Sequence, residues 1–153
     1  MKIFKPLLIL LVAALIFFSG FMLFHTFYVI DDVNIFDADV YVSDGKVGIN
    51  TDTDALHFGI VPKGASSGLR FMDINNTREY PVKVTFLAQG ELKGWFVSQI
   101  KYDNGTIKGG PTFLLEPGAT ERVSLLVMPG PESVPGGKYY GKIKVLVQKA
   151  KWS

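Results

Sequence analysis

A run of 25 residues without Asp, Glu, Lys or Arg, from Pro6 to Ile30, constrains this chain more than any other feature. Lys5 precedes the run, and Asp31 and Asp32 follow it. A helix of this length would be roughly 37 Å long at about 1.5 Å of rise per residue. The hydrocarbon core of a bilayer is only about 30 Å thick, so such a helix can cross it with some tilt. The run therefore predicts a membrane-spanning helix.

The charges around this run predict which way the chain faces. Lys2 and Lys5 lie before it, and basic residues are retained on the cytoplasmic side of a span. We therefore expect a single-pass protein of the cell membrane with a cytoplasmic N-terminus. Residues 1–30 would form the cytoplasmic tip and the transmembrane anchor, and residues 31–153 would form one domain outside the cytoplasm.

A cleaved signal peptide is the competing interpretation of the same run. A signal peptide has an apolar core of about 7–15 residues that ends in a small-x-small cleavage site. The run here is longer, and its central small pair, Ser19 and Gly20, directly follows two phenylalanines. We therefore favour an anchor that is retained.

The charge balance of the outer part argues against a nucleic acid partner. The whole chain carries a net charge of +2, and Lys2 and Lys5 account for all of it. From Asp31 onward, 14 basic residues balance 14 acidic ones, and no basic stripe with interleaved aromatic residues is present. The chain also has no cysteine, so the outer domain is expected to fold by packing alone.

The charges are nevertheless unevenly distributed along the outer domain. Residues 31–54 contain seven Asp and one Lys, whereas residues 138–151 contain five Lys and no acidic residue. One interpretation is that two charged patches serve two partners. We favour the other interpretation, in which the first and last strands are neighbours and their outward charges offset one another.

Strand patterns recur through the outer domain at the 8–12-residue spacing of sandwiches and barrels. Asp44-Gly45 predicts a hairpin turn after the first strand. The fold class that we predict is all-β: an immunoglobulin-like antiparallel β-sandwich of about eight or nine strands, preceded by a single N-terminal transmembrane helix. The expected strands cover residues 35–43, 46–51, 56–62, 69–74, 81–88, 95–100, 112–115, 121–128 and 139–148.

Several short motifs resemble a known family of modules. They are Phe58-Gly59-x-Val61-Pro62-Lys63-Gly64, Pro81-Val82-Lys83-Val84, Phe113-x-Leu115-Glu116-Pro117-Gly118 and Pro135-Gly136-Gly137-x-Tyr139-x-Gly141. Together they resemble the immunoglobulin-like sandwich modules of prokaryotic, in particular archaeal, envelope proteins, including NEW3-type modules. The resemblance covers roughly residues 56–147. It implies a sandwich fold and a role in adhesion, scaffolding or docking.

The combination of one membrane helix and one sandwich is also similar to the architecture of membrane-anchored stator subunits of the archaeal rotary filament. Those subunits project a β-sandwich toward the surface layer. This similarity concerns architecture and is carried by no residue motif. It implies a surface-layer or filament protein as partner.

We find no constellation that indicates catalysis or a cofactor, and we expect that the chain is not an enzyme. The chain has two histidines, and His57 has no His or Cys companion for a zinc site. Two Asp-x-Asp pairs would each present two carboxylates on one strand face. They are weak candidates for a cation site or, less favoured, for glycan hydrolysis, and solvated edge residues are the favoured interpretation. The pairs are Asp37 with Asp39 and Asp52 with Asp54.

Two further kinds of site are predicted on the surface. Asn75 and Asn104 each begin an N-x-[ST] triplet in an expected turn and are candidates for glycosylation. Tyr102, Tyr139 and Tyr140 lie in segments that we expect to contact a partner.

Three functional hypotheses follow. The favoured one is a membrane-anchored extracytoplasmic module that contacts an envelope protein, a surface layer or a surface filament. In the alternative, the chain is an accessory single-helix subunit of a membrane enzyme or transporter. The third and least favoured is a glycan-acting hydrolase. A second copy of the chain is a further candidate partner.

Overall fold

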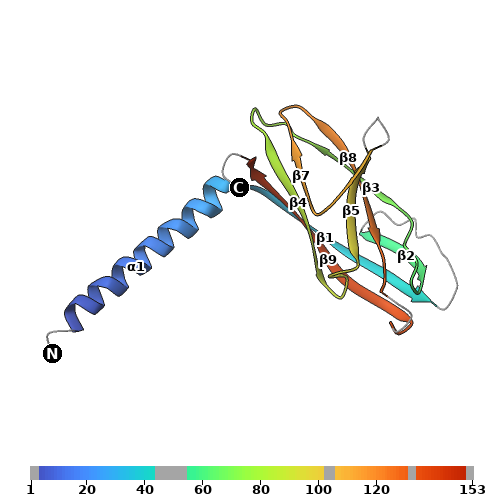
Figure 1. Cartoon of the computed structure of the whole chain (residues 1–153), viewed down its shortest axis with the longest axis horizontal. Coiled ribbons are helices and arrows are strands. Elements are labelled where there is room, and N and C mark those ends of the chain that lie inside the picture. The colour runs from blue at the N-terminus through green and yellow to red at the C-terminus, as the bar shows by residue number, and fades with distance from the viewer. Residues whose placement is uncertain (1–3, 44–54, 102–105, 131–133, 151–153) are drawn as a thin grey trace.

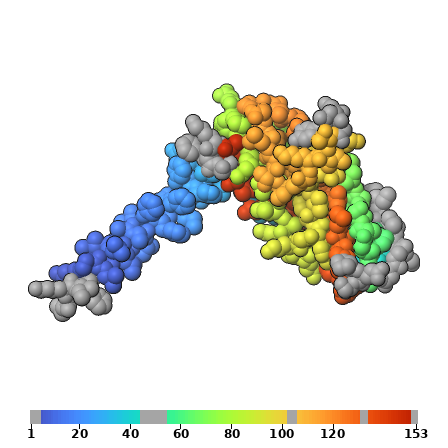
Figure 2. All heavy atoms as spheres, viewed as in Figure 1, coloured from blue at the N-terminus to red at the C-terminus, as the bar shows by residue number. Residues whose placement is uncertain are grey.

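The computed structural model describes residues 4–43, 55–101, 106–130 and 134–150 (Figure 1). Helix α1 (Phe4–Phe24) projects from one side of a β-sandwich that does not cover it (Figure 2). Its described side chains are exposed and almost entirely apolar. A helix that is apolar on every side needs an apolar environment such as a bilayer. By length and composition, the segment Lys5–Val29 can cross a membrane.

A short π-helix, η1 (His25–Val29), joins the membrane-type helix to the sandwich. The Phe24 and Tyr28 rings stack with their centroids 5.3 Å apart. Val29 is buried, and strand β1 begins at the next residue, Ile30. The helix therefore continues into the first strand without a linker.

Two sheets pack face to face to form the sandwich (Figure 1). Sheet A has the order β2 (Leu56–Pro62), β1 (Ile30–Ser43), β9 (Gly137–Lys149), β4 (Val82–Gly90) and β7 (Thr112–Leu115). Sheet B has the order β3 (Arg70–Asn75), β8 (Thr120–Val127), β5 (Phe96–Lys101) and β6 (Ile107–Gly109).

The core consists of the inward residues of both sheets, as period-2 alternation requires. On β4, Val82, Val84 and Phe86 are buried. The Phe86 ring meets the Phe113 ring of β7 edge-on at 6.1 Å between centroids. On β8, Val123, Leu125 and Val127 complete the opposite layer. The predicted class, an all-β sandwich of about eight or nine strands after one apolar helix, is confirmed, and the described residues form nine strands.

The first and last strands are neighbours, as we predicted from their charges. β1 and β9 pair antiparallel from Ile30 opposite Gln148 to Val42 opposite Gly137. Two ion pairs cross this boundary: Lys142 Nζ lies 3.4 Å from Asp37 Oδ1, and Lys138 Nζ lies 3.1 Å from Asp39 Oδ2. The acidic and basic ends of the outer domain therefore offset one another within one sheet.

The topology departs from an all-antiparallel arrangement at one place. β2 pairs parallel with β1, and His57 is the register partner of Asp39. The predicted Asp44-Gly45 turn and the strand at 46–51 lie outside the described residues. The short strand β6 was not predicted, because three residues that include a glycine carry no alternation.

Candidate functional site

Polar side chains converge at the end of sheet A that is remote from the helix. Asp39 is at the centre of this cluster, which we call the distal cluster: Asp37, Asp39, His57, Lys138, Tyr140 and Lys142. His57 Nδ1 lies 3.0 Å from Asp39 Oδ1, and Lys138 Nζ lies 3.1 Å from Asp39 Oδ2. The parallel pairing of β1 and β2 brings His57 beside Asp39.

The environment of Asp39 favours its ionised form. Burial raises the pKa of the Asp39 carboxyl, but hydrogen bonds from His57 and Lys138, together with their charges, outweigh burial and lower the pKa below its usual value. The same carboxylate holds the pKa of the Lys138 ammonium above its usual value, first through the hydrogen bond and then through its charge. The neighbours of Asp39 therefore favour its ionised form.

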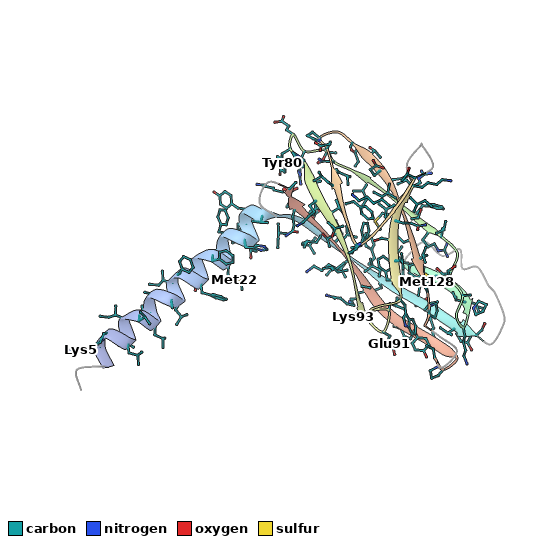
Figure 3. The ribbon with its side chains drawn as sticks, viewed as in Figure 1. Lys5, Met22, Tyr80, Glu91, Lys93 and Met128 are labelled. Carbon is teal, nitrogen blue, oxygen red and sulfur yellow. The ribbon has the colours of Figure 1, made fainter. Side chains whose placement is uncertain are left out.

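An open hollow of about 680 Å³ lies over the distal cluster. Its floor is the outer face of β1, β9 and the end of β4. The Tyr140 backbone N–H donates to Glu91 Oε2 over 2.8 Å at its rim, and Figure 3 labels Glu91 at this end of the sandwich. The lining residues are Asp37, Ala38, Asp39, Ala55, His57, Gln89, Gly90, Tyr140, Gly141 and Lys142.

Of the two Asp-x-Asp pairs that were candidates for a cation site, one lies in the described part of the chain. Asp37 and Asp39 share the outer face of β1, as their i, i+2 spacing requires, but lysines occupy the oxygens that a cation would need. Asp52 and Asp54 lie outside the described residues. Across the described ranges, no three His, Cys, Asp or Glu side chains converge as metal ligands. The distal cluster is built as an ion-pair network.

A second polar cluster lies where the helix meets the sandwich, and we call it the junction cluster. Arg78 Nε donates to Asp31 Oδ2 over 2.7 Å, and the Tyr80 hydroxyl donates to Asp31 Oδ1 over 2.8 Å. Lys149 Nζ lies 5.8 Å from the Tyr28 ring centroid and 5.4 Å from that of Tyr80. Figure 3 labels Tyr80 at this end. The cluster braces the last turn before the sandwich against β9 and the β3–β4 connection.

The predicted contact tyrosines have different surroundings. The Tyr139 ring packs edge-on against Trp95 at 4.9 Å, and its hydroxyl donates to the Pro135 carbonyl over 2.7 Å, so this side chain is partly buried. Tyr140 is exposed on the outer face, with Lys138 Nζ 5.1 Å from its ring centroid. Tyr102 lies outside the described residues. A contact role stays a prediction for Tyr140.

The two glycosylation candidates can be placed only in part. Asn75 ends β3 and is exposed, which leaves its side chain accessible. Asn104 lies outside the described residues. The next residue, Asn76, is buried, and its Nδ2 donates to the carbonyls of Tyr80, Leu115 and Glu116. Asn76 thereby ties the β3–β4 turn to the end of β7.

Two groups of exposed or partly exposed apolar side chains were not predicted from the sequence. The first, which we call the sheet A patch, is on the outer face of four adjacent strands: Val33, Ile35, Leu87, Leu114 and Leu146. The second, which we call the β3 edge patch, is Leu69 and Phe71, beside Leu126 and Val97 on the outer face of sheet B. Leu87 could have predicted the sheet A patch from the sequence. It is an apolar residue at an outward position of the strand on which Lys83 and Thr85 are the preceding outward residues.

Comparison with known proteins leaves the family open. No family model matches the chain, and no curated protein matches it. Among solved structures, it is similar to an antigen and type I fimbria protein of Burkholderia pseudomallei, with 12% sequence identity and a TM-score of 0.39. That similarity covers 76% of this chain and 96% of the other.

Proposed function

We propose that this chain is a membrane-anchored extracytoplasmic docking module. The helix holds the sandwich at the outer surface of the cell membrane, and the sandwich binds a protein of the envelope, a surface layer or a surface filament. The apolar helix, long enough to cross a membrane, and the β-sandwich that follows it support this proposal.

One observation carries the proposal: strand β3 is an edge strand with exposed apolar side chains. Among the described strands it pairs with β8 alone, which makes it an edge strand of sheet B. The Phe71 side chain is 60% exposed on this strand, and Leu69 is 46% exposed just before it. An edge of this kind accepts an added strand, whose backbone supplies hydrogen bonds while apolar pockets supply selectivity.

The surroundings of β3 favour a protein as the partner. Arg122 Nε and Nη2 bind the Asp73 carboxylate at 2.7 and 2.9 Å, which leaves the centre of the edge apolar and its charges paired. Such an apolar centre with a polar rim is typical of protein interfaces. Sheet B also lies on the side of sheet A away from the helix (Figure 1).

Site-specific photo-crosslinking tests the proposal. A photoreactive amino acid at Phe71 of the full chain, expressed in native membranes, should give one saturable adduct with an envelope or surface protein. The matched control is Lys108, which is exposed on the opposite edge strand of the same sheet, and it should not give that adduct. Equal labelling from both positions, or no protein adduct from Phe71, would reject docking at β3.

The alternative, an accessory subunit that docks through its helix, is favoured by one observation. The described side chains of α1 are exposed, so no face of the helix is covered by the sandwich. This leaves the whole surface of the helix for other helices of a complex. In that case residues 1–30 alone would co-purify with the complex, whereas the docking proposal requires residues 31–153 for capture.

A further inference from the structure

The strands of sheet A run across the direction of helix α1, and sheet B lies beyond them (Figure 1). The outer face of sheet A is therefore turned toward the side on which the helix stands. When the helix crosses a bilayer, this face is turned toward the membrane surface. Sheet B is turned away from it.

The connection between helix and sheet is short and braced. Val33, the first residue of the sheet A patch, is four residues after Val29, or about 13 Å along an extended strand. Val29 is buried, and Lys149 lies between the Tyr28 and Tyr80 rings. The pairing of Asp31 with Arg78 and Tyr80 holds the start of β1 from the other side. These contacts oppose a swing of the sandwich away from the bilayer.

The side chains of the sheet A patch lie on β1, β9, β4 and β7, and most of them are well exposed. Ile35 and Leu114 are each 57% exposed, and Leu87 is 42% exposed. The register places Ile35, Lys144 and Leu87 in one row, and Val33, Leu146 and Thr85 in the next. Val33, Ile35 and Leu146 therefore adjoin one another on β1 and β9, and Leu87 lies diagonal to Leu146 on β4. Lys83 and Thr85 of β4 separate Leu114 of β7 from this group. Exposed apolar side chains that adjoin one another in this way are candidates for an interaction surface.

Lysines lie next to these apolar side chains, as expected for a surface that binds phospholipid. Lys144 stands between Ile35 and Leu87, and Lys83 is the register partner of Leu114. A lysine covers apolar surface with its stem and carries its ammonium to a phosphate group. Further along the same face, the ion pairs Asp37–Lys142 and Asp39–Lys138 are polar, which suits contact with the headgroups.

We infer that the outer face of sheet A lies on the bilayer surface, with the sheet A patch inserted among the headgroups and first acyl carbons of a phospholipid membrane. The inference rests on the anchoring by α1 that is proposed above. It makes the sandwich a module held flat against the membrane by two elements, a spanning helix and an apolar sheet face. The occupant is a lipid surface, because the face is continuous with the lipid-exposed helix and carries lysines among its apolar side chains.

Single-cysteine labelling tests this inference directly, because the chain has no native cysteine. Ile35→Cys and Leu114→Cys report on the sheet A patch. Phe71→Cys is the matched control on the opposite sheet, and Leu15→Cys reports on the anchor. Each full-length variant carries the environment-sensitive dye NBD in nanodiscs of phosphatidylcholine and phosphatidylglycerol. Doxyl-labelled lipid quenches dye in the bilayer, and iodide quenches dye in water.

The expected result is a blue-shifted emission at Ile35 and Leu114, quenched by doxyl lipid and protected from iodide. Dye at Phe71 should show the reverse. If the Leu15 dye is lipid-quenched while the Ile35 and Leu114 dyes are quenched by iodide like the Phe71 dye, the inference is overturned and the anchor stands. If the Leu15 dye is also quenched by iodide, both the inference about the sheet A patch and the proposed membrane anchor are overturned. Protection from iodide without lipid quenching would mean that protein covers the patch, which likewise overturns the inference.

Discussion

Asn76→Ala should destabilise the sandwich more than any other single change in a turn. The Asn76 Nδ2 donates to three carbonyls at 3.0 to 3.1 Å, and its Oδ1 accepts the Arg78 N–H at 3.0 Å. An amide has two protons, so these contacts amount to about three net hydrogen bonds at roughly 1 kcal/mol each. The expected loss in free energy of unfolding is about 3 kcal/mol, or roughly 10–15 °C in Tm for a domain of this size.

Two companion variants separate hydrogen bonding from packing. Asn75→Ala, at the exposed neighbouring position, should change the free energy of unfolding by less than about 0.5 kcal/mol. Asn76→Asp keeps the shape of the side chain but removes both donor protons, so at neutral pH it should destabilise at least as much as Asn76→Ala. The measurement is urea unfolding of the full chain in nanodiscs, followed by tryptophan fluorescence. The reasoning is refuted if Asn76→Ala matches Asn75→Ala, or if Asn76→Asp is as stable as the natural chain.

Three further predictions concern packing and pH. Phe86→Ala should lower the free energy of unfolding by about 3–5 kcal/mol in the same assay, because its buried ring leaves a cavity. A Cβ on Gly141 would meet the Gln89 carbonyl oxygen at 2.5 Å, so Gly141→Ala should destabilise by about 1–3 kcal/mol, whereas Gly109→Ala, with open space around it, should not. Burial raises the pKa of Asp31, but hydrogen bonds from Tyr80 and Arg78 outweigh it and the pKa is lowered, so its stabilising contribution is present above about pH 4 and is lost as pH falls through the folded-state pKa. Asp31→Asn should therefore be less stable than the natural chain at neutral pH, and thermal unfolding at several pH values should show this difference shrinking in acid.

Local alternation made most of the sandwich predictable. β4, β8 and β9 each carry inward apolar residues at every second position, and their observed bounds differ from the predicted ones by a few residues at most. The pairing of the acidic and basic segments was predictable too, because opposite charges on neighbouring strands attract one another. The apolar helix followed from its length alone.

Long-range register was not predictable in the same way. Asp39 and His57 are register partners only because β2 runs parallel to β1, and nothing in the local pattern around either residue specifies that direction. For Tyr139, by contrast, the sequence could have predicted a packed ring instead of a partner contact. It has the same parity on β9 as the inward residues Ile143 and Val145, so alternation already placed its ring toward the core.

The positions of the two apolar surfaces on different sheets suggest different occupants for them. The sheet A patch and the β3 edge patch are on opposite outer faces, separated by two sheets that pack about 10 Å apart. A soluble sandwich with both surfaces free would be prone to association, because each is a site for unwanted contacts. A sandwich held flat on a bilayer has one of these faces covered by lipid, and only the β3 edge is then left for a protein. The helix, in this arrangement, does more than retain the module at the membrane, because its braced connection to β1 determines which face the module offers to a partner.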